Sequence, residues 1–144
     1  LSPDSGLDLS DESWPIYARS VDAPPIYMGG DSHVSHSAIN RGCDIEGTVE
    51  NSVLSPRVTI EKGARVSYSV ILPGVTVEAG SVIEYAIIGE GCHIGRECRV
   101  GGTPDSAPGG KWNLTVLAPD CALEDGREIA PGVMLDRYGK EVLK

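Results

Sequence analysis

The fold of this chain is decided by a short phrase that returns every 17 residues: Asn51-Ser52-Val53-Leu54, Tyr68-Ser69-Val70-Ile71 and Tyr85-Ala86-Ile87-Ile88. Around these copies, aliphatic residues recur at spacings of five or six, namely at Val49, Leu54, Ile60, Val66, Ile71, Val77, Ile83, Ile88, Ile94 and Val100. Three such steps complete one period. A fourth copy, His36-Ser37-Ala38-Ile39, lies upstream, and its coil is two residues shorter between Ile45 and Val49. A repeat of this length predicts a solenoid.

Glycine marks the corners of the repeat. Three residues after most of the aliphatic positions comes Gly, followed by a small residue, as in Ile60…Gly63-Ala64 and Ile88…Gly91-Cys92. Gly suits a corner because it adopts positive φ without a Cβ clash. The chain has no Phe, so stacked Val and Ile must fill the core, about 4.8 Å from their counterparts in neighbouring parallel strands. We predict an all-β, single-stranded parallel β-helix of about five to six coils.

Other fold classes fit the pattern poorly. A spacing of five to six residues matches no helical period, and Gly, Pro and β-branched residues are poor helix formers. A β-sandwich would show period-two alternation and hairpin dipeptides such as Asn-Gly, which the middle of the chain lacks. Periodicity does not give the hand of the coil. The prediction that it is left-handed, against the general rule for crossovers, rests on similarity to hexapeptide-repeat proteins.

The repeat also divides the chain. Residues 33–144 are expected to form the β-helix, with an extruded loop at 101–115 and a tail from Asp136 to Lys144. Residues 1–32 are expected to be a linker and N-terminal cap, because the open end of a solenoid needs covering. The chain opens at Leu1 rather than Met, so we expect a piece excised from a longer protein.

Charge and hydropathy limit the partners. The net charge of −9 and the pI near 4.7 disfavour nucleic acid and anionic membranes, which need clustered Lys and Arg. No apolar run approaches the roughly 20 residues of a membrane span, and the N-terminus lacks the features of a signal peptide. We expect a soluble, cytoplasmic protein.

The four cysteines are interpreted as core residues. Each stands four residues after an aliphatic residue, at the inward corner position that Ala64, Ser81, Val58 and Val75 occupy elsewhere, and no pair has Cys-x-x-Cys spacing: Cys43, Cys92, Cys98 and Cys121. Packing explains this placement better than a disulfide or a zinc site.

The remaining candidates for chemistry are weak. His33, His36 and His93 could suggest a hexapeptide acyltransferase or a trimeric carbonic anhydrase, but His93 should point to solvent and coils separate it from the other two.

The motif Gly109-Gly110-Lys111 departs from a phosphate loop, because Asp105 stands where the first Gly is required and Trp112 where Ser or Thr is required. Asn113-Leu114-Thr115 matches a glycosylation acceptor without meaning in a cytosolic chain, and the pairs Asp11-Glu12 and Glu124-Asp125 are interpreted as solvated surface. We assign no catalytic, cofactor-binding or metal residue.

The first part of the chain resembles a known family, bacterial glucose-1-phosphate adenylyltransferase (ADP-glucose pyrophosphorylase). The residues that carry this resemblance are Leu7-Asp8-Leu9-Ser10-Asp11-Glu12-Ser13-Trp14-Pro15-Ile16-Tyr17, Pro24-Pro25, Val34-Ser35-His36-Ser37-Ala38-Ile39 and Gly42-Cys43-Asp44-Ile45-Glu46-Gly47-Thr48-Val49-Glu50-Asn51-Ser52-Val53-Leu54. The later coils are generic hexapeptide repeat, and the match weakens after Val100.

The resemblance implies the C-terminal domain of an enzyme that converts ATP and glucose 1-phosphate to ADP-glucose and pyrophosphate, with Mg²⁺, for glycogen synthesis. It implies a tetramer whose nucleotide chemistry belongs to an N-terminal Rossmann-like domain with a Gly-rich, Arg-containing loop that this chain lacks. The β-helix would serve subunit contact and allosteric effectors and would be catalytically silent. Catalytic and regulatory subunits are not distinguished. Candidate effector contacts are Lys111, Arg127, Arg137 and Lys140. Alternatives are a stand-alone acyltransferase and another sugar-nucleotide transferase.

Overall fold

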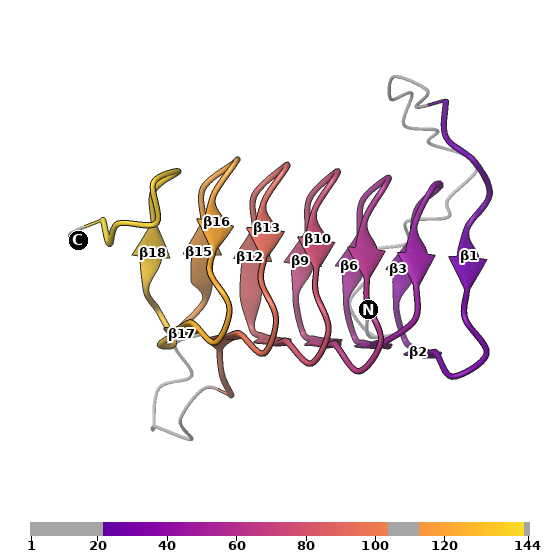
Figure 1. Cartoon of the computed structure of the whole chain (residues 1–144), viewed down its shortest axis with the longest axis horizontal. Coiled ribbons are helices and arrows are strands. Elements are labelled where there is room, and N and C mark those ends of the chain that lie inside the picture. Colours follow the sequence, from indigo (N-terminus) through magenta and orange to yellow (C-terminus); the bar gives the residue numbers. More distant parts are fainter. Residues whose placement is uncertain (1–21, 104–112, 143–144) are drawn as a thin grey trace, which may run out of the picture.

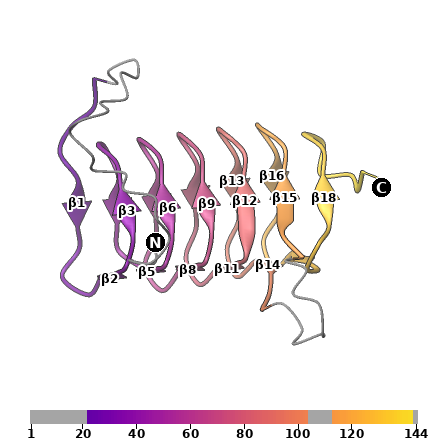
Figure 2. The ribbon, with the colours of Figure 1, turned by 180° about the vertical axis from the view of Figure 1, so that it is seen from behind.

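A computed structural model describes residues 22–103 and 113–142, and every regular element in them is a β-strand. The strands form three parallel six-stranded sheets, and the chain visits the sheets in turn, once per coil. Six coils stack side by side, with β1 at one end and β18 at the other (Figure 1, and from behind in Figure 2). The described residues contain no helix long and apolar enough to cross a membrane.

Each sheet collects one strand from every coil. Sheet A contains β1 (Tyr27–Met28), β4 (Asp44–Ile45), β7 (Thr59–Ile60), β10 (Thr76–Val77), β13 (His93–Ile94) and β16 (Ala122–Leu123). Sheet B contains β2 (His33–Ser35), β5 (Thr48–Glu50), β8 (Arg65–Ser67), β11 (Val82–Glu84), β14 (Arg99–Gly101) and β17 (Glu128–Ile129). Sheet C contains β3 (Ala38–Ile39), β6 (Val53–Leu54), β9 (Val70–Ile71), β12 (Ala86–Ile88), β15 (Thr115–Leu117) and β18 (Met134–Leu135).

The register of the strands confirms the 17-residue repeat. Leu54 pairs with Ile71, Ile71 with Ile88, and Ile88 with Leu117. The core is the column of aliphatic side chains inside the three sheets, and all those from Ile45 to Leu117 are at most 1% exposed. This arrangement of three parallel sheets around one core is that of a left-handed parallel β-helix, as predicted.

The corners contain both expected and unexpected backbone conformations. Gly42, Gly63 and Gly91 have φ between 69° and 76°, which confirms the role predicted for corner glycine. At the corner from sheet B to sheet C, however, the left-handed residue is not Gly. His36, Asn51, Tyr68 and Tyr85 occupy that position with φ of 47–48°, a conformation that costs a residue with a Cβ roughly 1–2 kcal/mol.

A ladder of serine hydroxyls compensates for this strained corner. Ser52 follows Asn51, and its hydroxyl donates to Glu50 O at 2.7 Å while accepting from Ser69 N at 3.1 Å. The Ser69 hydroxyl repeats the pattern with Ser67 O and Ala86 N. These bonds satisfy backbone groups that a regular strand would pair, and a buried unpaired group would cost about 1–3 kcal/mol.

The two ends of the solenoid differ from the sequence-based expectation. Strand β1 pairs with β4 and lies within residues 1–32, so the ladder of strands begins at Tyr27 and not at residue 33. Trp14 and Tyr17, expected in the cap, lie outside the described residues. At the other end the expected tail folds back: Leu135 forms an antiparallel bridge with Glu141, and Val142 N donates to Met134 O at 2.8 Å. Residues 136–142 therefore form a hairpin on the last coil.

The shortened second coil depends on one glycine. Between β4 and β5 only Glu46 and Gly47 turn the corner that other coils make with four residues. A Cβ on Gly47 would lie 2.3 Å from Ala64 O and 2.8 Å from Glu61 O, which are backbone atoms of the next coil.

We therefore expect Gly47→Ala to destabilise the domain by about 2–3 kcal/mol, because the next coil would have to move to admit the methyl group. Thermal or urea unfolding followed by circular dichroism measures this. Gly30→Ala is the matched control, since a Cβ there meets nothing within 4 Å. Equal stability of the two variants would contradict the tight corner.

Candidate subunit interface

The three faces of the solenoid differ in their outward side chains. Sheet A turns Asp44, Thr59 and His93 outward, and sheet B turns out Arg65 and Glu84. On sheet C every outward residue is apolar: Ala38, Val53, Val70, Ile87, Val116 and Met134. We call these six residues the apolar stripe. A continuous apolar surface of this kind marks an interaction site more often than an isolated exposed side chain does.

The stripe arises from the short strands of sheet C. A strand of two residues directs one side chain inward and the next outward, and the sequence places aliphatic residues at both positions in Val53-Leu54, Val70-Ile71 and Ile87-Ile88. The corresponding strands of sheet A instead have Thr outside, as in Thr59-Ile60 and Thr76-Val77. Val70 is 37% exposed and Met134 40% exposed, while the other four residues are partly buried.

Two stacked tyrosines border the stripe. Tyr68 and Tyr85 occupy the strained corner that leads into sheet C in successive coils. Because their backbones repeat the same conformation, the rings lie nearly parallel, with 6° between planes and 4.8 Å between centroids. Tyr68 is 47% exposed. Tyrosine is enriched at protein interfaces, where its ring contributes contact area and its hydroxyl stays solvated.

A groove runs along the opposite border, where sheet C turns into sheet A. It has a volume of about 600 Å³, and its lining includes Pro56, Pro73 and Pro119 from three of the four corners that it spans. Arg57 lies toward its N-terminal end, and Glu90 and Asp120 lie toward its C-terminal end. The groove is therefore lined by proline and glycine, with a positive charge in its N-terminal half and two negative charges in its C-terminal half.

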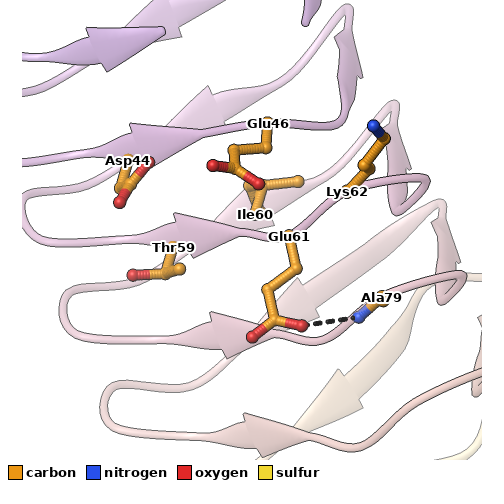
Figure 3. Close-up of a pocket in the computed structure, with 7 residues that line it drawn as sticks. All are labelled: Asp44, Glu46, Thr59, Ile60, Glu61, Lys62 and Ala79. Atoms are coloured by element: carbon orange, nitrogen blue, oxygen red, sulfur yellow. Dashed lines mark hydrogen bonds between the residues drawn. The ribbon is translucent and has the colours of Figure 1, made fainter. Parts of the chain in front are cut away.

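A smaller hollow on sheet A has a different character. It encloses about 280 Å³, and its acidic side chains are Asp44, Glu46 and Glu61 (Figure 3). Glu61 accepts a bond from Ala79 N at 3.0 Å, and the ammonium of Lys62 lies 3.4 Å from Asp31. Within residues 22–103 and 113–142, no three His, Cys, Asp or Glu side chains converge so as to hold a metal ion. We interpret this hollow as solvated polar surface.

The four cysteines lie at the inward corners, as predicted. Cys43, Cys92, Cys98 and Cys121 are buried and unpaired. The thiol of Cys92 donates to Ala118 O at 3.1 Å, and that of Cys98 to Glu124 O at 3.1 Å. Burial raises the pKa of all four thiols, that of Cys92 to about 11. Such thiols are poor nucleophiles and poor metal ligands at neutral pH.

The histidines are separated, as expected. His93 Nε2 lies 3.0 Å from a carboxylate oxygen of Glu78 on the outside of sheet A, and the His93 side chain is 51% exposed. His33 lies four coils away, 3.8 Å from Glu50.

Two of the four basic residues proposed as effector contacts have local structural roles. Arg127 donates to Gly139 O at 3.1 Å, and Arg137 donates to Asp120 at 2.7 Å, so both tie the C-terminal hairpin to the stack. Lys140 is exposed. Lys111 and the Gly109-Gly110-Lys111 motif lie outside the described residues, as does Asp11-Glu12.

Two other sequence motifs prove structural. Thr115 of the Asn113-Leu114-Thr115 motif is fully buried, and its hydroxyl accepts from Gly132 N at 3.2 Å. Asp125 of the Glu124-Asp125 pair accepts from Arg96 N at 2.9 Å, although both acidic residues are exposed, as expected.

Comparison with known proteins places this fold in a family. The chain belongs to the GlmU-like C-terminal hexapeptide proteins, which residues 27–115 match. It is also 48% identical over 66 residues to glucose-1-phosphate adenylyltransferase from Geobacillus stearothermophilus, which confirms the resemblance noted in the sequence. That alignment covers 46% of this chain but only 17% of the relative.

Solved structures share the architecture. The acetyltransferase domain of PglB from Neisseria gonorrhoeae FA1090 superposes with a TM-score of 0.62 at 18% identity, covering 83% of this chain and 58% of that one. GDP-perosamine N-acetyl transferase from Caulobacter crescentus gives 0.60 at 14% identity, covering 85% and 58%. At these identities the likeness shows the fold alone.

The buried thiols predict a stability that falls at alkaline pH. The unfolded Cys92 thiol ionises near pH 9, whereas the folded chain keeps the proton to about pH 11. This thiol's contribution to stability is therefore complete below pH 9 and is lost as the pH rises from 9 to 11. Cys92→Ala should show a shallower decline in melting temperature over this range, measured by calorimetry at pH 8 to 10.5. Parallel curves for the two proteins would refute the pKa assignment.

Proposed function

We propose that this chain is the assembly and regulatory domain of a cytoplasmic glucose-1-phosphate adenylyltransferase, and that its apolar stripe contacts a second subunit. The observation that carries the proposal is the contrast between the uniformly apolar outward face of sheet C and the polar faces of sheets A and B. The similarity to the Geobacillus enzyme supports the identity of the parent enzyme. In that enzyme, ATP and glucose 1-phosphate would react in a separate catalytic domain.

The regular stacking of strands in sheet C favours contact with another stacked sheet. Side chains of the stripe project at intervals of about 4.8 Å along the solenoid, so two such rows can interdigitate with their sheets about 10 Å apart. Each Å² of apolar surface removed from water contributes about 25 cal/mol. The tyrosine border and the proline groove lie on either side of the stripe and would extend the contact.

The regulatory part of the proposal rests on the family resemblance. Backbone hydrogen bonds join every coil to the next, so the stack moves as one body with little internal deformation. A ligand that alters the subunit contact would therefore shift the whole domain. Arg127 and Arg137 hold the C-terminal hairpin. Of the described candidates, Lys140 therefore has the least structural constraint for contacting an effector.

We expect the chain to self-associate, and Val70→Asp to weaken that association at least tenfold. The variant places a carboxylate in the apolar stripe of each copy, where the contact would take it away from water. Sedimentation equilibrium of the wild type and the variant measures this. Thr76→Asp is the matched control, because Thr76 lies outward on sheet A, and it should leave association unchanged. A wild-type chain that is monomeric at high concentration would contradict the proposal.

The alternative function, an acyltransferase, has one specific observation in its favour. A histidine whose ring nitrogen lies close to a carboxylate, as His93 Nε2 lies 3.0 Å from Glu78, is an arrangement that supports general-base catalysis.

We expect this chain to release no thiol from acetyl-CoA with amine acceptors, and to form no ADP-glucose from ATP and glucose 1-phosphate. A thiol-reactive dye and chromatography of nucleotides provide the two readouts. Acetyl-CoA turnover that is lost in His93→Gln would establish the acyltransferase and overturn the proposed function.

A further inference from the structure

We infer that two copies of this chain pack their apolar stripes antiparallel, about a two-fold axis that runs along β9, so that Arg57 of each copy meets the partner's Glu90. This inference rests on the proposed subunit contact and specifies its geometry. It is carried by the order of charges along the groove that borders the stripe.

The corners from sheet C to sheet A carry a graded series of charges. From the first corner to the fifth, the second or third residue of the turn is Arg41, Arg57, none charged (Pro73-Gly74), Glu90 and Asp120. Two positive charges thus precede an uncharged corner, and two negative charges follow it. Rotation by 180° about an axis through the uncharged third corner brings the corner of Arg57 opposite the partner's corner that holds Glu90, and the corner of Arg41 opposite the one that holds Asp120, so the order of charges is complementary to its own reverse.

Closed symmetry leaves two ways to place stripe on stripe. In a two-fold dimer, the axis lies in the contact plane either along the solenoid or along the strands. If it ran along the solenoid, the groove of one copy would face the tyrosine border of the other, where the corners hold Asn51, Tyr68 and Tyr85. If it runs along the strands, groove faces groove with reversed coil order, and unlike charges meet.

The side chains of Arg57 and Glu90 are free to form ion pairs with a second copy. Within the described residues Glu90 and Arg41 have no ion-pair partner, and the guanidinium of Arg57 donates only to the carbonyl of Asp22, at 2.6 Å. Asp120 already bonds Arg137 at 2.7 Å. Discrimination between the two orientations therefore depends mainly on Arg57 and Glu90, which form two equivalent pairs in the dimer.

The same axis gives an acceptable contact within the stripe. Val70, in the third coil, would meet the partner's Val70, and Val53 would meet the partner's Ile87. The small Ala38 of the first coil would lie opposite the partner's Val116. Met134, in the sixth coil, would project beyond the overlap.

Disulfide cross-linking of single-cysteine additions tests the orientation. With a mild oxidant such as diamide, Val70→Cys should cross-link to itself. Val53→Cys should not do so alone, but it should cross-link when mixed with Ile87→Cys. The wild type is the control, since its four thiols are buried. Self-linking of Val53→Cys would establish the parallel arrangement, and linking of Val70→Cys only to Ile87→Cys would shift the axis by half a coil. Either result overturns the inference while leaving the subunit contact intact.

Charge reversal provides an independent readout. Arg57→Glu and Glu90→Arg should each weaken self-association about three- to tenfold, and the double variant should recover wild-type affinity within about twofold, because each pair is then restored in the opposite sense. Failure of the double variant to recover would overturn the inference. A wild-type chain that does not associate at all would remove the contact itself, which is the separate failure of the proposed function.

Discussion

Every feature of this domain depends on the in-register pairing of parallel strands between successive coils. Each strand interior to a sheet bonds to the strand before it and the strand after it, for example β9 to β6 and β12. A residue therefore stands directly on its equivalent in the next coil. When equivalent positions have side chains of the same type, these side chains form a column along the solenoid. The aliphatic core, the serine ladder and the apolar stripe are columns of this kind, and each repeats with the same period because the backbone imposes it.

Columns also explain why strained or unusual positions persist. A left-handed Tyr or Asn is costly in isolation, but the serine that follows it bonds to the coils on both sides. The compensation is shared along the column, as is the stacking of Tyr68 on Tyr85. Where a column is interrupted, a substitute appears: Ala86 ends the serine ladder, and Thr115 hydroxyl in the next coil takes up the same role with Gly132 N.

The sequence predicts the repeated part of this structure well, because periodicity reports stacking directly. Spacing alone predicts that Leu54, Ile71 and Ile88 share one column and that Cys92 and Cys121 lie at the inner corner. Non-repeating contacts are invisible to that reasoning. Strand β1 has a single neighbour, so Met28 stays half exposed and provides no aliphatic signal, and the hairpin that bridges Leu135 to Glu141 occurs once. The apolar stripe was present in the repeated phrase, but inward and outward residues are distinguished only once strand boundaries are known.

The segment between Gly101 and Thr115 shows how such a stack accommodates added sequence. The strands on either side keep their partners, since Val100 pairs with Ile129 and Ile88 with Leu117, although 13 residues separate β14 from β15. Doubling the length of a flexible loop costs only about 0.6 kcal/mol in closure entropy. An insertion at a corner therefore need not change the core residues. Homologous proteins can differ in the length of their corner insertions while the stacked strands stay the same.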